Sequence, residues 1–205
     1  IPAMAGAWIA LEGMPDPLVD QDEIVVAAGD IFPALVASGV SPVGPPAEWF
    51  TAPSFDKRYG LHVEDDGRVW GHLYGWGECH TGSPRGQCVQ LSRGRVGFDY
   101  MVAVDGRGVV CADGGFVRTG PLCISGDHAA LGLGWSAAQR HYADTCLAIA
   151  DIRIGEDAFG IWAVGALRPD VDEETVRVLR GSAPSVDCRP IGGRLEVVAV
   201  LAVNM

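Results

Sequence analysis

The five histidines of this chain are the first candidates for chemistry, because imidazole is the side chain that titrates near neutral pH without help from its surroundings. His62 alternates with apolar residues in a predicted strand, and we expect it to be structural. His72, His80 and His128 can each line a site or serve as hydrogen-bonded residues of the core, a turn or a loop. His141 differs because it ends a predicted helix and leads directly into an apolar hairpin, where a base is held rigidly.

A serine on a constrained backbone is the second ingredient of nucleophilic catalysis. Ser185 lies in the segment 182–187, between a predicted helix and the final strand, although this segment also fits a linker rich in small residues. A nucleophilic serine needs a base within hydrogen-bond reach, and the base needs an acceptor that orients it. Glu196 is the best acceptor by position, because a carboxylate in this apolar strand is costly to bury unless something pairs with it. Ser182 is the alternative nucleophile.

The six cysteines bear on redox state and on metal binding. They include no C-x-x-C pair, and we expect reduced, partly buried thiols and no metal. Two metal-binding alternatives remain. One site combines Cys79, His80 and Cys88 with Cys111, Cys123 or His128. The other is a hydrolase site of His72, His80, His128 and Asp127.

The charge of the chain limits its partners. A net charge of −11, from 15 basic and 26 acidic side chains, argues against nucleic acid, because neutralising phosphates takes clustered lysine and arginine. The sequence has no apolar run of the about eighteen residues that a membrane span needs. It also begins without the basic region of a secretory signal. We therefore expect a soluble, acidic protein without a nucleic-acid partner, a membrane partner or a cofactor.

Glycine and proline divide the sequence into short pieces and favour many short strands with turns. The pattern predicts an α+β fold, with a small antiparallel β-barrel or strongly bent sheet and peripheral helices. The predicted hairpins pair residues 61–63 with 68–74, 98–104 with 108–111, and 147–154 with 160–167. A last, central strand covers 194–203, and two helices cover about 135–142 and the segment from Pro169 to Gly181.

Two regions are expected along the chain. Residues 1–58 form an N-terminal extension with apolar stretches at 7–11 and 23–27 and a proline-rich connector at 41–53. Each proline ring removes a donor and fixes φ, so this connector is neither a central strand nor a helix interior. Residues 59–205 form the barrel domain.

The order of the motifs points to a known family. A histidine, an apolar hairpin, a capped helix, a serine and a strand with a glutamate follow one another. From residue 59 onward the chain resembles the capsid maturation (prohead) proteases of tailed phages, which share a clan with the herpesvirus assemblins. The forms from phages of actinobacteria are the most similar, through Gly71-His72-Leu73 with Cys79-His80, His141-Tyr142, Gly155-Glu156-Asp157 with Gly160-Ile161-Trp162, Leu167-Arg168-Pro169, Ile191-Gly192-Gly193-Arg194-Leu195-Glu196 and Ala202-Val203-Asn204. The chain reads Ser185-Val186-Asp187-Cys188-Arg189 where such sequences often read Ser-Gly-Asp-Trp-Arg, and residues 1–58 match poorly.

This resemblance implies a serine endopeptidase. Ser185 would attack the peptide carbonyl, His141 would take and return the proton, and Glu196 would orient the imidazole. His128 and His80 are the alternatives for the base or the third member. The resemblance also implies cleavage of scaffold segments and of the chain itself inside the immature capsid, in the host cytoplasm. The implied partners are the scaffold protein or domain, the major capsid protein and further copies of this chain. A catalytically inactive shell- or scaffold-binding module of the same fold is the alternative function.

Overall fold

The computed structural model describes residues 44–80, 83, 86–94, 100 and 107–203. They belong to one compact unit, Val43–Met205. Its elements in chain order are η1 (Ala47–Phe50), β1 (His62–Val63), β2 (Arg68–Gly75), β3 (Gly108–Val110), β4 (Phe116–Arg118), β5 (Gly120–Ser125), α3 (Trp135–Thr145), β6 (Leu147–Glu156), β7 (Gly160–Leu167), α4 (Glu173–Gly181), β8 (Ala183–Ile191) and β9 (Arg194–Val203). The fold is α+β, as the sequence predicted.

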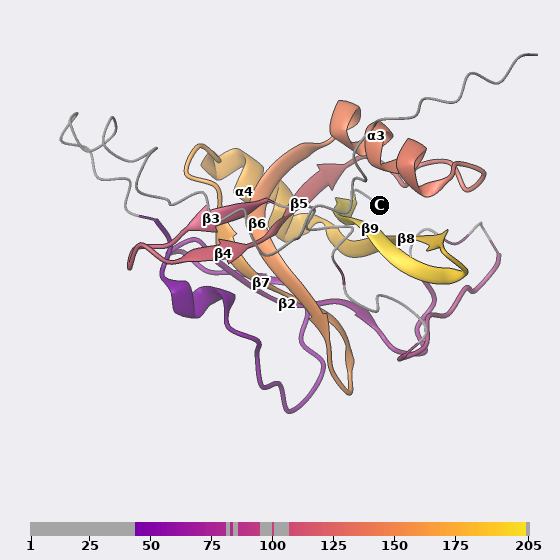
Figure 1. Cartoon of the computed structure of the whole chain (residues 1–205), viewed down its shortest axis with the longest axis horizontal. Coiled ribbons are helices and arrows are strands. Elements are labelled where there is room, and N and C mark those ends of the chain that lie inside the picture. The colour runs from indigo at the N-terminus through magenta and orange to yellow at the C-terminus, as the bar shows by residue number, and fades with distance from the viewer. Residues whose placement is uncertain (1–43, 81–82, 84–85, 95–99, 101–106, 204–205) are drawn as a thin grey trace, which may run out of the picture. The chain divides into compact units, whose positions relative to one another are not determined.

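The main sheet runs in the order β1-β2-β7-β6-β5-β9-β8 among the described residues (Figure 1). Its neighbours are antiparallel except β5 and β9, which are parallel, so the expectation of a wholly antiparallel sheet is wrong. In a flat sheet, strands five places apart would be separated by about 24 Å. Some Cα atoms of β2 and β8 nevertheless lie within 8 Å, which means that the sheet is strongly bent. No hydrogen-bonded ladder joins these two strands in the described part of the chain, and the sheet does not close into a barrel.

Two of the three predicted hairpins are present. β1 pairs with β2 across a turn in which Gly67 has a φ of +93°, a value that favours glycine. Residues 150–156 of β6 pair with residues 161–167 of β7. The third predicted hairpin paired residues 98–104 with 108–111. In the structure β3 pairs with β4 instead, and these two strands form a separate small sheet. The other expected strand of this hairpin, 98–104, lies outside the described residues except for Tyr100.

The core is formed mainly by buried side chains from the strands of the bent sheet. β9 is an interior strand, as predicted, and its Val197, Val200 and Leu201 are at most 1% exposed. Burying side chains of this size stabilises a fold by roughly 1.5–3 kcal/mol each. α3 packs Ala138 and Tyr142 against β9 in a second apolar cluster.

The helix α4 leads the chain into β8. It begins after Asp172, whose carboxylate accepts a hydrogen bond from the backbone N–H of Thr175 at 2.7 Å. It ends at Gly181, as the sequence predicted, and β8 begins two residues later. None of the helices in the described ranges is long and apolar enough to span a membrane.

The segment before residue 59 takes part in the fold from residue 44 onward. The four-residue helix η1 places Phe50 in a buried cluster with Cys111 and Ala166. Arg153 of β6 donates a hydrogen bond of 2.9 Å to the Phe50 carbonyl. The part of the proline-rich run from 44 to 53 is therefore packed on the sheet. The apolar stretches at 7–11 and 23–27 lie outside the described residues.

Candidate functional site

Ser185 lies in β8 and not in a linker, which corrects the simpler interpretation of segment 182–187. β8 is the edge strand of the main sheet, and an edge strand tolerates the missing donor of Pro184. Ser185 pairs in register with Leu201 of β9 and is 2% exposed. A hydroxyl in such a buried position is expected to be hydrogen-bonded.

His128 lies next to this serine. Its Nε2 is 2.9 Å from Ser185 Oγ, which is hydrogen-bond distance. The strand register explains the approach. Ser125 at the end of β5 and Ala183 at the start of β8 both pair with Val203 of β9, from opposite sides. The loop after β5 therefore delivers His128 to the serine.

His80 completes a cluster of three residues from three separate segments. Its Nε2 is 2.6 Å from the carbonyl oxygen of Val186, and a carbonyl only accepts, so Nε2 carries the proton. Its ring centroid is 5.2 Å from that of His128, with the two planes at 63°. The backbone N–H of His80 donates to the Val89 carbonyl at 2.8 Å, which holds this loop in place.

The structure does not place His141 at the serine, which corrects the expected pair. His141 lies on α3 with its ring centroid 5.3 Å from that of Tyr142, and no contact with Ser185 is found for it among the described residues. The neighbouring Tyr142 faces the site instead, and its hydroxyl is 2.5 Å from Asp187 Oδ2. Successive helix residues point about 100° apart, so the two side chains cannot face the same way.

Glu196 is also displaced from its expected role. It pairs with Arg189, whereas Ser185 pairs with Leu201, five residues farther along β9. This separation is roughly 16 Å along the strand, too far for Glu196 to orient the imidazole at Ser185. Glu196 is 7% exposed, and its Oε2 has no hydrogen-bond partner among the described residues. Ser182, the alternative nucleophile, follows α4 and donates to the Val178 carbonyl at 2.8 Å.

A buried ion pair behind the site holds the loop that carries His128. Arg189 donates from Nε and from a terminal nitrogen to the two carboxylate oxygens of Asp187, at 2.7 and 2.8 Å. Both residues are at most 4% exposed. The guanidinium also donates to the carbonyls of Ala129, Ala130, Leu131 and Leu133, at 2.8–3.2 Å. Sequence reasoning missed this clamp, although the Asp187-Cys188-Arg189 triplet is part of the quoted motif.

Burial favours neutral imidazoles at the site. Desolvation lowers the pKa of His80 below 6.5. The pKa of His128 is also lowered from 6.5, first by desolvation and then by the nearby charge of a protonated His80. A neutral imidazole can accept a proton from Ser185, which is the requirement for a general base.

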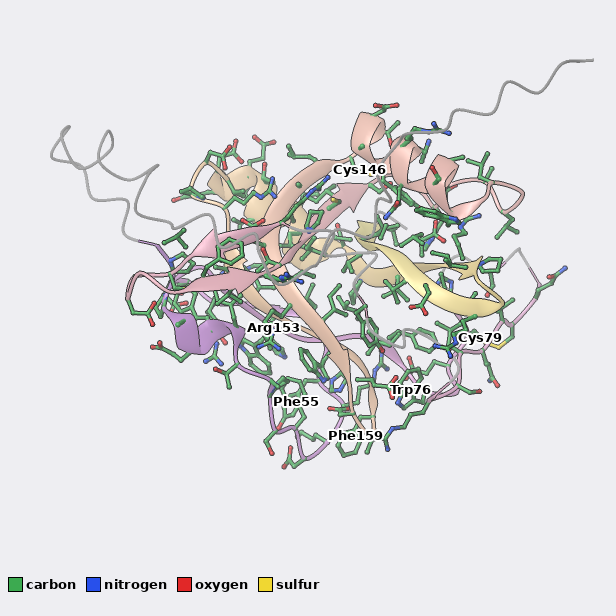
Figure 2. The ribbon with its side chains drawn as sticks, viewed as in Figure 1. Phe55, Trp76, Cys79, Cys146, Arg153 and Phe159 are labelled. Carbon is green, nitrogen blue, oxygen red and sulfur yellow. A yellow bond between two sulfur atoms is a disulfide. The ribbon has the colours of Figure 1, made fainter. Side chains whose placement is uncertain are left out.

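The sulfur chemistry differs from the expectation of reduced thiols. Cys79 and Cys88 form a disulfide, and Figure 2 labels Cys79 beside this bond. The remaining four cysteines are free. Because a metal binds the thiolate form, the disulfide removes two ligands from the metal site proposed around His80.

His72 contacts Asp157, and in the described part of the chain no contact joins it to His80 or His128, the other histidines of the second metal set. Its Nε2 is 3.2 Å from both carboxylate oxygens of Asp157, and its Nδ1 accepts from the Tyr59 N–H. Phe55 and Phe159 border its ring, and Figure 2 shows both near the turn between β6 and β7. In the described ranges, no three or more His, Cys, Asp or Glu side chains form a metal-binding group.

A pocket of about 520 Å³ opens beside the histidine pair. His80 and His128 line it, together with Asp187 and Arg189. Its apolar lining consists of Val89, Leu91, Leu131, Leu133, Pro190 and Leu195.

Comparison of the chain with models of protein families, with curated proteins and with solved structures found no match.

Proposed function

We propose that the protein is a serine endopeptidase in which Ser185 is the nucleophile and His128 the base. The observation that carries this proposal is the 2.9 Å distance between His128 Nε2 and Ser185 Oγ. Burial lowers the pKa of His128 and so favours its neutral form. A serine within hydrogen-bond reach of a neutral imidazole is the arrangement that nucleophilic catalysis needs. The family resemblance implies the same reaction, the same nucleophile and an assemblin-like fold, but with His141 as the base where the proposal has His128.

The proposed reaction moves one proton through His128. Nε2 takes the proton of the Ser185 hydroxyl as Oγ attacks the peptide carbonyl, and then returns it to the leaving amine. An acyl-enzyme forms at Oγ, and water releases it with the same base. His80 acts as a positioning residue, because Val186 fixes its tautomer and its ring lies against that of His128.

The proposed biological setting rests on the resemblance. The substrates are scaffold segments and the chain itself, cleaved inside the immature capsid in the host cytoplasm. The partners are the scaffold, the major capsid protein and further copies of the chain. Residues 1–58 have no assigned role in this proposal.

Labelling with a fluorophosphonate tests the proposed nucleophile. We expect stoichiometric labelling at Ser185, no labelling of Ser185→Ala, and retained labelling of Ser182→Ala. Mass spectrometry of the digested protein locates the adduct.

One observation favours the catalytically inactive binding module as the second candidate function: Ser185 is only 2% exposed. A folded wild-type protein that takes up no label would support that module and overturn the protease.

The pH dependence of cleavage reports on the base. Catalysis needs neutral His128, so kcat/KM should be maximal at neutral pH and fall as His128 becomes protonated. The midpoint should lie below 6.5, because burial and the charge of His80 lower the pKa of His128. The rate is measured between about pH 4.5 and 8, with circular dichroism at each pH to confirm folding. A midpoint above 6.5 would contradict this assignment.

A further inference from the structure

The pocket beside His80 and His128 has an apolar wall whose residues come from two loops and from the β8–β9 hairpin. Val89 and Leu91 lie in the loop after β2, and Leu131 and Leu133 in the loop after β5. Leu195 and Pro190 belong to β9 and β8. Two of these segments also carry the two histidines. A substrate bound to the histidine pair therefore meets this wall.

The rim of the pocket exposes large apolar side chains to solvent. Leu131 is 69% exposed, Val89 48% and Leu133 37%. Seven large hydrophobic residues are exposed in the described part of the chain. Three of the seven, Val89, Leu131 and Leu133, line this pocket. Exposed apolar residues that gather at a concave site are typical of a binding surface.

The charged residues of the pocket offer no free charge to a ligand. Asp187 and Arg189 bind each other through two hydrogen bonds, and the guanidinium is further occupied by the carbonyls of the 129–133 loop. Burial favours the neutral form of both histidines. A charged substrate side chain would lose its hydration here without gaining a partner, which is unfavourable.

We propose that this pocket binds the side chain of the residue whose carbonyl Ser185 attacks, and that it selects a large apolar side chain such as leucine or phenylalanine. The inference rests on the proposed function. Its volume of about 520 Å³ is enough to hold either of these side chains. Acidic and basic residues at this position are rejected.

Peptidyl diphenyl phosphonates that differ only in the side chain next to phosphorus test the selection. The leucine and phenylalanine probes should label Ser185 at least about 10-fold faster than the aspartate and lysine probes. Diisopropyl fluorophosphate, which carries no such side chain, is used in parallel. Equal rates for all the phosphonates, with normal labelling by the fluorophosphate, would overturn the pocket assignment and leave the protease standing. No labelling by any reagent would overturn both.

The variant Leu131→Asp tests the wall itself. Leu131 is exposed, so the fold should tolerate the change, and labelling by diisopropyl fluorophosphate, which carries no such side chain, reports the reactivity of Ser185 in the variant. Labelling by the leucine probe should fall about 10-fold, and labelling by the lysine probe should rise. Leu147→Asp is the matched control, because Leu147 is 60% exposed and does not line the pocket. An equal loss in both variants would contradict the proposal.

Discussion

Replacing His128 by alanine is expected to lower kcat/KM for peptide cleavage by about 10³-fold or more, with the fold retained. The variant loses the nitrogen that lies 2.9 Å from Ser185 Oγ, and with it the acceptor for the serine proton. The ring is half-buried in a loop, where a truncation leaves the sheet intact. Cleavage of a scaffold-derived peptide, with a thermal melt of each protein, measures both effects.

His141→Ala is the matched control for this prediction. It removes the histidine that motif order favours, from a helix position that lies against Tyr142. Its kcat/KM should remain within about threefold of the wild-type value, as should that of Glu196→Gln. A loss in His141→Ala equal to that expected for His128→Ala, with His128→Ala active, would reverse the assignment of the base.

The second large effect concerns stability. Arg189→Met should lower the free energy of unfolding by about 3–5 kcal/mol, because it leaves the buried Asp187 carboxylate without its counter-charge. It also removes the donors that hold the carbonyls of the 129–133 loop. Since this loop follows His128 directly, cleavage by the folded fraction should fall as well. Urea denaturation monitored by tryptophan fluorescence measures the first effect.

Arg180→Met provides the comparison for that variant. Arg180 also donates to a carboxylate and to a carbonyl, those of Asp65 and Val63, but its side chain is 48% exposed and that of Asp65 98%. An exposed pair of this kind contributes less than about 1 kcal/mol. Similar losses of stability in the two variants would show that the buried clamp has no special weight.

The elements that were predicted from the sequence are those with local signals. The β1–β2 and β6–β7 hairpins have turn residues between two strand-like stretches, and α4 has a capping residue and a terminal glycine. β5 and β8 escaped prediction because both contain proline, at 121 in β5 and at 184 and 190 in β8. Proline argues against a strand unless the strand lies at an edge, and the edge position of β8 follows only from the complete sheet.

The candidate site could be predicted in part for a similar reason. Ser185 and the two alternative histidines were recognised by residue type and neighbouring motif. The approach of His128 to Ser185 depends on the parallel pairing of β5 with β9, where Leu122 is opposite Val200. No local pattern encodes that register, so the order of the motifs favoured His141. Glu196 was chosen because it is charged within an apolar strand, but the register places it at the far end of β9.

The position of β9 between β5 and β8 also sets the time at which the site can exist. His128 follows one neighbour of this strand and Ser185 lies in the other, so the two sides are joined only when β9 is inserted between them. Residues 194–203 leave the ribosome after every residue of the site. Pairing them with β5 closes a loop of more than seventy residues, and such distant contacts form late in folding. A growing polypeptide therefore has no assembled Ser185–His128 pair before β9 is complete, and the proposed cleavage would begin only after that.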